Sequence, residues 1–299
     1  MDVTAMRENR SSWVPWVLLA IGVASVSISA ILIRYATDAE PLAISFWRCF
    51  AGAGALLPFA RSGLTSMPTT GFRISVVAGV FLALHFGTWI TSLELTTIAA
   101  SVLLVTTGPI WVATAAWLLL KERITPVVWA GIGLTLLGAA LVAGGDFGGS
   151  SIEGNLLALI GGATAGWYVL AGQQARRDVG IIEYAVVTYS VAGVLIAIAC
   201  WIAGTPLWGY SGQTWLAIAA VVIGPQLLGH TVINKVLKDI DATTVSVVIM
   251  IEPIIATFLA YALFDEIPTW LVYPGGAAIL AGIYLVTTKR KAEPVDVPL

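Results

Sequence analysis

The sequence is poor in the charged residues that keep a soluble protein hydrated. Only 11% of its 299 residues are charged, whereas 58% are hydrophobic. A soluble domain carries charges at about a quarter of its positions. A soluble protein is therefore excluded, and the composition predicts an integral membrane protein.

Residues and motifs for redox, metal and nucleotide chemistry are also scarce. The only cysteines, Cys49 and Cys200, both lie in apolar runs, which argues against a disulfide framework or a metal site. No His/Cys/carboxylate cluster, phosphate-binding glycine loop or nucleophile elbow occurs. The 30 glycines are explained by close packing of membrane helices. We expect no enzyme activity, no cofactor, no metal and no nucleic-acid partner.

The chain does contain a series of apolar runs of about 20 residues, the length of a helix that crosses a bilayer. The first run is too long for a signal peptide and is predicted as the first span. The ten predicted helices are 13–35, 42–60, 72–95, 98–120, 125–144, 154–174, 182–203, 214–237, 243–264 and 270–288. Because the links are short, we expect an all-α membrane protein with ten transmembrane helices in one bundle.

Lysine and arginine are distributed unevenly over the links, and this sets the orientation in the membrane. With the N-terminus in the cytoplasm, all 15 fall at the inner side except Arg34 and Arg48, which lie in the outer halves of the first two helices. Outer links receive none. Both termini are therefore predicted to be cytoplasmic, with the protein in the cell (inner) membrane.

An internal repeat runs through the chain at an offset of 144 positions, as from Pro109 to Pro253. In gap-free register, Pro109, Glu122, Thr125, Gly131 and Gly138 correspond to Pro253, Glu266, Thr269, Gly275 and Gly282. Each half holds five helices, and this odd number inverts the second half in the membrane. Inverted repeats build many secondary transporters. The alternative is that apolar helices resemble one another by composition.

The predicted organisation follows from this repeat. It consists of a cytoplasmic tail (1–12), a first five-helix repeat (13–144), an outer linker (145–153), a second, inverted repeat (154–288) and a cytoplasmic tail (289–299).

The repeated segments 99–142 and 242–286 resemble the paired EamA repeats of the drug/metabolite transporter superfamily. Pro41, Arg48 and the pair Trp167 and Tyr168 fit the same pattern. The resemblance covers essentially the whole chain and implies ten helices in two inverted halves. Members include amino-acid and metabolite exporters of the YddG type, nucleotide-sugar carriers and triose-phosphate carriers. The sequence shows no cationic cluster at the midplane of the kind that phosphorylated substrates need.

A lone carboxylate, Glu252, stands in the middle of the ninth predicted helix. A charge at this depth costs about 2.5 to 3.5 kcal/mol on insertion scales, so it must face protein or water. Pro253 can kink the helix beside it. The equivalent pair is Gly108 and Pro109, so the two halves share the kink but not the carboxylate. We predict that Glu252 binds a proton or a substrate amine. The alternative is a carboxyl group that is permanently protonated or hydrogen-bonded between helices.

Polar residues follow one face of the eighth predicted helix. Gln226, His230, Asn234 and Lys238 recur every four residues. This stripe predicts a wall of an inner vestibule, although hydrogen bonds between helices explain Gln226 and Asn234 equally well. Histidine titrates near neutral pH, so His230 is a candidate to share proton handling with Glu252.

Aromatic residues near the membrane centre mark two more walls. His85 and Trp89 share a face of the third helix, and Trp167 and Tyr168 lie in the sixth. By resemblance to the amino-acid exporters, such aromatic walls suit the hydrophobic side chain of a zwitterionic substrate. A hydrogen-bonded core histidine is the alternative for His85. The predicted substrate-binding residues are His85, Trp89, Thr107, Trp111, Trp167, Tyr168, Gln226, His230 and Glu252.

Charged residues near the outer surface are candidates for gating. Arg34, Arg48 and Glu94 lie within a turn or two of it. A pair such as Arg48 with Glu94 would neutralise both charges and form an outer gate, or a static structural bridge. Pro109 and Pro253 are the predicted bending points.

Together these features predict a secondary transporter that exports amino acids or related small amphipathic metabolites by alternating access. The two inverted halves would rock around a site formed by predicted helices 1, 3, 4, 6, 8 and 9. No ATP-binding domain occurs, so proton antiport or the substrate gradient would drive transport. The expected partners are a small-molecule substrate, the lipid bilayer and protons. Alternatives are carriers of organic cations, drugs or phosphorylated metabolites, a channel, or an intramembrane enzyme.

Overall fold

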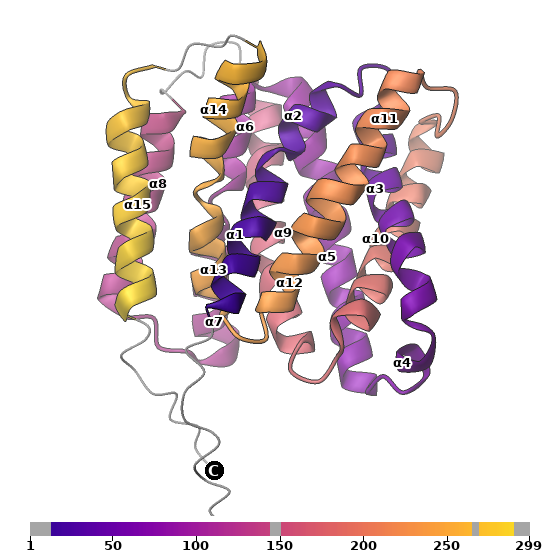
Figure 1. Cartoon of the computed structure of the whole chain (residues 1–299), viewed down its shortest axis with the longest axis horizontal. Coiled ribbons are helices and arrows are strands. Elements are labelled where there is room, and N and C mark those ends of the chain that lie inside the picture. Colours follow the sequence, from indigo (N-terminus) through magenta and orange to yellow (C-terminus); the bar gives the residue numbers. More distant parts are fainter. Residues whose placement is uncertain (1–12, 144–150, 265–268, 290–299) are drawn as a thin grey trace, which may run out of the picture.

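The computed structural model describes residues 13–143, 151–264 and 269–289, which form an all-helical bundle (Figure 1). The first half contains α1 (Val14–Ser27), α2 (Ser29–Arg34), α3 (Pro41–Leu56), η2 (Leu57–Phe59), α4 (Arg61–Thr65), α5 (Thr69–Leu95), α6 (Ile98–Val105), α7 (Gly108–Leu120) and α8 (Pro126–Val142). The second contains α9 (Ile152–Ala175), α10 (Ile181–Ala203), α11 (Gly212–Val221), η3 (Val222–Thr231), α12 (Val232–Val236), α13 (Ala242–Ile249), α14 (Glu252–Phe264) and α15 (Val272–Lys289). All ten predicted runs are helical.

Within the described residues, eight helical segments have the length and apolar composition of a membrane span. Two further apolar helical segments, Pro126–Val142 in α8 and Val272–Thr288 in α15, are shorter, so the count of ten crossings stays a prediction. α1 begins and α15 ends at the same, lower end of the bundle (Figure 1), as an even number of crossings requires. The predicted tails 1–12 and 290–299, positions 145–150 of the outer linker, and Glu266 lie outside the described residues.

Equivalent helices begin in the same way in both halves. The Thr97 hydroxyl accepts a hydrogen bond from Ala100 N at 3.1 Å and caps α6. The Asp241 carboxylate accepts one from Thr244 N at 2.8 Å and caps α13. Thr97 and Asp241 are 144 positions apart, and each satisfies a backbone donor that the first helical turn leaves unpaired.

Two transmembrane helices are broken at equivalent points. Thr106–Thr107 separates α6 from α7, and Met250–Ile251 separates α13 from α14. These breaks are also 144 positions apart. Pro109 and Pro253 occupy the second position of α7 and α14, where the missing proline N–H removes no helical hydrogen bond. The predicted kinks are therefore helix breaks placed just before the prolines.

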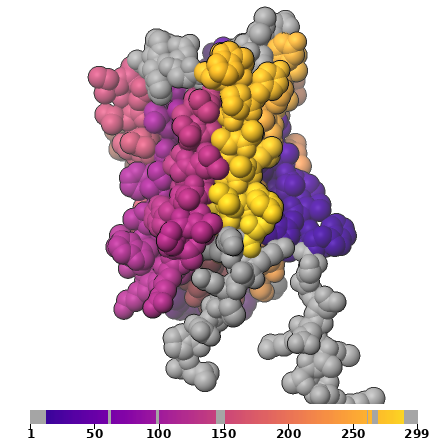
Figure 2. All heavy atoms as spheres, turned by 90° about the vertical axis from the view of Figure 1, so that its left-hand side faces the viewer, coloured from indigo at the N-terminus to yellow at the C-terminus, as the bar shows by residue number. Residues whose placement is uncertain are grey.

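The packing of α8 against α15 shows how the halves are related (Figure 2). A Cβ atom on Gly138 would lie 2.5 Å from the Gly275 carbonyl oxygen, and one on Gly282 would lie 2.6 Å from that of Gly131. Exchanging the halves converts one contact into the other, which is the pattern of a two-fold axis between two helices. Glycine permits this close approach, so the geometry supports the inverted repeat.

The two halves are intertwined. α5 packs against α9, α3 against α10, and α1 against η3, and one continuous buried core contains residues from both halves. Rocking of each half as a separate body would disrupt these contacts, whereas bending at the helix breaks would leave them in place.

Candidate functional site

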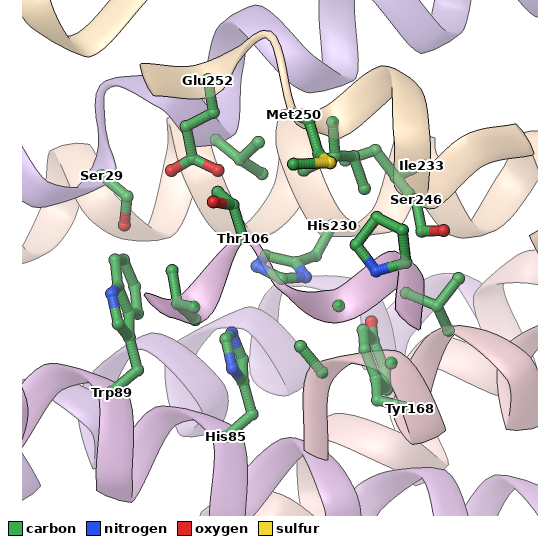
Figure 3. A pocket seen from close by; sticks show the side chains of 18 residues that line it. Ser29, His85, Trp89, Thr106, Tyr168, His230, Ile233, Ser246, Met250 and Glu252 are labelled. Atoms are coloured by element: carbon green, nitrogen blue, oxygen red, sulfur yellow. The ribbon is translucent and has the colours of Figure 1, made fainter. Parts of the chain in front are cut away.

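A cavity of about 100 Å³ lies between the two helix breaks. Its lining comes from six segments: α1 with α2, α5, α6 with α7, α9, η3 with α12, and α13 with α14 (Figure 3). These are predicted helices 1, 3, 4, 6, 8 and 9, so the structure brings together the six predicted walls. Both breaks reach the cavity, through Thr106 and Met250.

Glu252 is the only carboxylate among the residues that line this cavity, which include no lysine or arginine. It is the first residue of α14, is 8% exposed, and directs its carboxylate into the cavity (Figure 3). The N-terminal end of a helix carries a partial positive charge that favours an anion. Gly108 holds the equivalent position at the start of α7 and also lines the cavity.

The two histidines of the chain meet in this cavity. Their ring centroids are 6.3 Å apart. Nδ1 of His85 donates to the Gly161 carbonyl at 2.9 Å, which leaves Nε2 as the acceptor of the neutral ring. His85 and His230 are 145 positions apart, one more than the repeat offset. His230 lies in η3, a π-helix, and such wider turns accommodate an extra residue.

Asn234 connects two walls of the cavity. Its amide donates to the Tyr168 hydroxyl and, at 2.6 Å, to the His230 carbonyl. Tyr168 and His230 both line the cavity, but Asn234 lies behind them. Trp89 stacks parallel to His85 at 5.7 Å, and its buried Nε1 has no hydrogen-bond partner among the described residues.

Four predicted binding residues lie outside the lining of the central cavity. Trp167 stacks on Phe81 at 5.7 Å. Trp111 Nε1 donates to the Thr107 hydroxyl at 3.3 Å. Gln226 is fully buried and bonded to an arginine. The structure therefore leaves His85, Trp89, Tyr168, His230 and Glu252 at the cavity.

Several lining residues were not predicted, chiefly small or apolar ones. They are Val26, Ser29, Val105, Thr106, Gly108, Ala165, Gly166, Val169, Ile233, Ser246, Ile249 and Met250. The repeat offset and the two prolines together marked the helix breaks in the sequence, and Thr106 and Met250 lie at these breaks. Ser29 follows a break between α1 and α2 at Ile28, which neither glycine nor proline marks in the sequence.

A second cavity, of about 550 Å³, lies beside the link between α2 and α3. Arg34 and Glu94, two of the predicted gating residues, both line it. Ala30 and Ile90 also line it, and each directly follows a residue of the central cavity. The two cavities are therefore neighbours.

Arg48 is fully buried and does not meet Glu94. Its Nε donates to Gln226 Oε1 at 3.1 Å, and its Nη1 donates to Ser29 Oγ at 3.4 Å. Its Cζ lies 3.7 Å from the centre of the Phe86 ring, a cation–π contact. Glu252 is near enough for its carboxylate to interact with the Arg48 charge through space, but no ion pair joins the two among the described residues. The predicted pair of Arg48 with Glu94 is thus not formed in this structure.

The link between α2 and α3 is fastened to the second half. Asp38 accepts hydrogen bonds from the Thr214 hydroxyl and, at 2.7 Å, from Ser211 N. These bonds lower the pKa of Asp38 below its usual value. Arg176, in the link after α9, donates from Nε to the Asn234 carbonyl of α12 at 3.3 Å. Both contacts join the helical segment formed by α11, η3 and α12 to a neighbouring link.

Comparison with known proteins places these features in a wider group. A sequence profile of the EamA-like transporter family matches residues 13–144 and 152–288. The uncharacterized transporter YdfC of Bacillus subtilis (strain 168) is 26% identical over 249 residues, which cover 81% of this chain and 80% of the relative. An uncharacterized transporter of Archaeoglobus fulgidus is 23% identical over 262 residues, which cover 85% and 90%.

A solved structure described as "Crystal structure of protein" has the same fold. It matches with a TM-score of 0.78 and 20% sequence identity, over 96% of this chain and 100% of its own. At this identity the likeness concerns the fold alone.

Proposed function

The chain belongs to the EamA-like transporter family, and on this basis we propose that it is a secondary transporter that exports amino acids by alternating access. Membership and the relatives establish a multi-pass membrane transporter. Substrate, coupling and direction form the proposal.

One observation carries the proposal: the central cavity lies where two equivalent helices are broken, and one break supplies its only carboxylate. Broken helices at the midplane of inverted repeats are typical of substrate sites in secondary transporters. They expose helix ends to a ligand and provide points at which the bundle can bend.

Glu252 is the proposed coupling residue. Arg48 acts on Glu252 only through space, and no ion pair to Glu252 is formed among the described residues; because a buried carboxylate without an ion-pair partner is costly, the site without substrate is proposed to hold a proton. A substrate ammonium group that enters the cavity supplies a positive charge and displaces that proton. Exchange of the proton for the substrate ammonium group at Glu252 couples substrate export to proton entry. His230 lines the same cavity and is the proposed group that receives or passes the proton.

Amino acids are favoured by the walls of the cavity. His85, Trp89 and Tyr168 provide aromatic surface, which suits an apolar side chain, and Glu252 suits the ammonium group. Because no lysine or arginine lines the cavity, sugar phosphates and nucleotide sugars lack a partner for their charge. The same acidic lining makes organic cations the second candidate substrate class.

Membrane orientation is also part of the proposal. The lysine and arginine distribution supports an inner-membrane protein with both termini in the cytoplasm. The cavity next to the transport site then opens on the outer side, where Arg34 and Glu94 lie.

The substrate class is tested by thermal stabilisation of the purified protein in detergent. The panel contains amino acids, organic cations, sugar phosphates and nucleotides. We expect amino acids with apolar side chains to raise the melting temperature, because ligands that bind only the folded state stabilise it. Stabilisation restricted to phosphorylated compounds would overturn the proposed substrate class.

A further inference from the structure

Arg48 is a fully buried cation, and its position near the central cavity suggests a role in substrate binding. It is 0% exposed, and among the described residues no carboxylate forms an ion pair with it. Burial of a charge costs several kcal/mol unless good partners compensate it. Its direct contacts are with two neutral groups and an aromatic ring, Glu252 acts on it only through space, and Nη2 has no hydrogen-bond partner in the described chain. Stability alone does not explain such a residue.

Ser29 connects this guanidinium to the central cavity. Ser29 Oγ accepts a hydrogen bond from Arg48 Nη1 at 3.4 Å, and Ser29 lines the central cavity. Since its oxygen serves as the acceptor, the Ser29 hydroxyl proton is available to donate to a ligand. An anion hydrogen-bonded to Ser29 would also be attracted by the positive charge of the Arg48 guanidinium behind Ser29.

Trp89 adds a second donor at the same end of the cavity. Its Nε1 is buried without a hydrogen-bond partner among the described residues. Ser29 and Trp89 each directly precede a residue that lines the second cavity, so both lie at the end of the central one that adjoins it. Figure 3 shows both side chains at the edge of the site. Two hydrogen-bond donors, Ser29 and Trp89, therefore line this end of the cavity, and the Arg48 cation lies behind Ser29.

We propose that Ser29, positioned and polarised by Arg48, binds a carboxylate group of the transported molecule, with Trp89 as a second donor. The inference rests on the proposed function and sharpens it, because it selects amino acids over organic cations. Glu252 takes the ammonium group and Ser29 the carboxylate. Arg48 touches no substrate and acts as a positioning residue.

Binding of three related ligands to the wild-type protein tests this assignment without any mutation. The ligands are L-leucine, L-leucine methyl ester and 3-methylbutylamine, measured in detergent at mildly acidic pH, where all three carry an ammonium group. Because a hydrogen bond to a charged group contributes about 1.5 to 3 kcal/mol, L-leucine should bind about ten- to a hundredfold more tightly than its ester or the amine.

Two variants show whether Ser29 and Arg48 produce that preference. Ser29→Ala removes one hydroxyl and should bring the acid-to-ester ratio towards one, with ester binding unchanged. Ser25→Ala is the matched control, because Ser25 Oγ is bonded to the Ile21 carbonyl within the same helix and lies outside the cavity lining. Arg48→Lys should lower the ratio too, since lysine lacks the planar fork that reaches both Gln226 and Ser29.

The outcomes separate this inference from the proposed function. Equal binding of acid and ester by the wild type, or a Ser29→Ala variant that weakens both equally, overturns the carboxylate site and leaves amine transport standing. If none of the three ligands binds, and no amino acid of a wider panel binds either, the result contradicts both the proposed substrate class and the carboxylate site.

Discussion

The two broken helices have the same backbone plan and different chemistry. In both, a short helix ends at the cavity, two residues follow, and a second helix begins with a proline in its first turn. The caps, Thr97 and Asp241, are equivalent as well. At the first residue of the second helix, however, one half has Gly108 and the other has Glu252.

This difference separates what the fold requires from what transport requires. The breaks and the glycine contacts recur in both halves because the two-fold arrangement needs them twice. A carboxylate in each half would place two like charges in one small cavity, and they would repel each other. One carboxylate is enough to bind one cation, so we propose that the asymmetry serves transport.

The largest effect is expected when the asymmetric group, the Glu252 carboxylate, is removed. Glu252→Gln retains the shape of the side chain and deletes the ionisable group, so substrate uptake driven by a pH gradient in proteoliposomes should fall to background. Glu153→Gln alters an exposed carboxylate in the first turn of α9 and should transport like the wild type. Unchanged pH-dependent uptake by Glu252→Gln would remove Glu252 from the coupling role.

The next prediction concerns the symmetric part of the molecule. Gly138→Ala and Gly282→Ala, at equivalent positions, each bring a Cβ against backbone atoms of the facing helix. Each should destabilise the protein by about 1 to 3 kcal/mol, and by similar amounts. Gly133→Ala is the control, because a Cβ there meets nothing within 4 Å. Thermal unfolding in detergent measures all three, and a strong difference between Gly138→Ala and Gly282→Ala would argue against the two-fold relation.

Moving the carboxylate to the other half tests whether the two breaks are interchangeable. A Cβ on Gly108 would have only an ordinary contact, 3.7 Å from the Gly162 carbonyl oxygen, and Gly108 lines the cavity, so a side chain can start there without a backbone clash. Glu252→Gly alone should lose proton-driven uptake, and the double variant with Gly108→Glu should regain about a hundredth to a tenth of the wild-type rate, since small misplacements cost about a hundredfold. No recovery in a folded double variant would show that the second break has a special role.

The smallest effect is expected at Asp38, in the link between α2 and α3. The lowered pKa of Asp38 means that its hydrogen bonds stabilise the folded protein above the ordinary aspartate pKa and that this contribution is lost as the pH falls through the lowered value. Asp38→Asn should therefore melt slightly below the wild type at neutral pH, with the gap closing in acid. A melting difference that is the same at every pH would contradict this account.

The sequence predicts the general architecture well because two strong patterns determine it. Runs of about 20 apolar residues can only be stable in a bilayer as helices, and the register of the repeat locates both breaks through Pro109 and Pro253. Glu252, His85 and His230 were recognisable because polar groups within apolar helices must turn inward. All three line the cavity.

The direction of individual side chains was harder to predict. Trp167 and Tyr168 are adjacent, and neighbouring side chains on a helix point about 100° apart, so only Tyr168 reaches the cavity. Ser29 looks like any serine that bonds its own helix. Arg48 was predicted near the outer surface, where Glu94 would be in reach, but the position of α3 against α10 and η3 buries it completely.

Proton release on substrate binding tests the central claim most directly. The purified wild-type protein in weakly buffered detergent is mixed with the amino acid that stabilises it best, and a pH indicator records the protons released. We predict about one proton for each substrate bound by the wild type and none by Glu252→Gln. Binding without proton release, or equal release by the variant, would contradict the exchange of a proton for an ammonium group at Glu252.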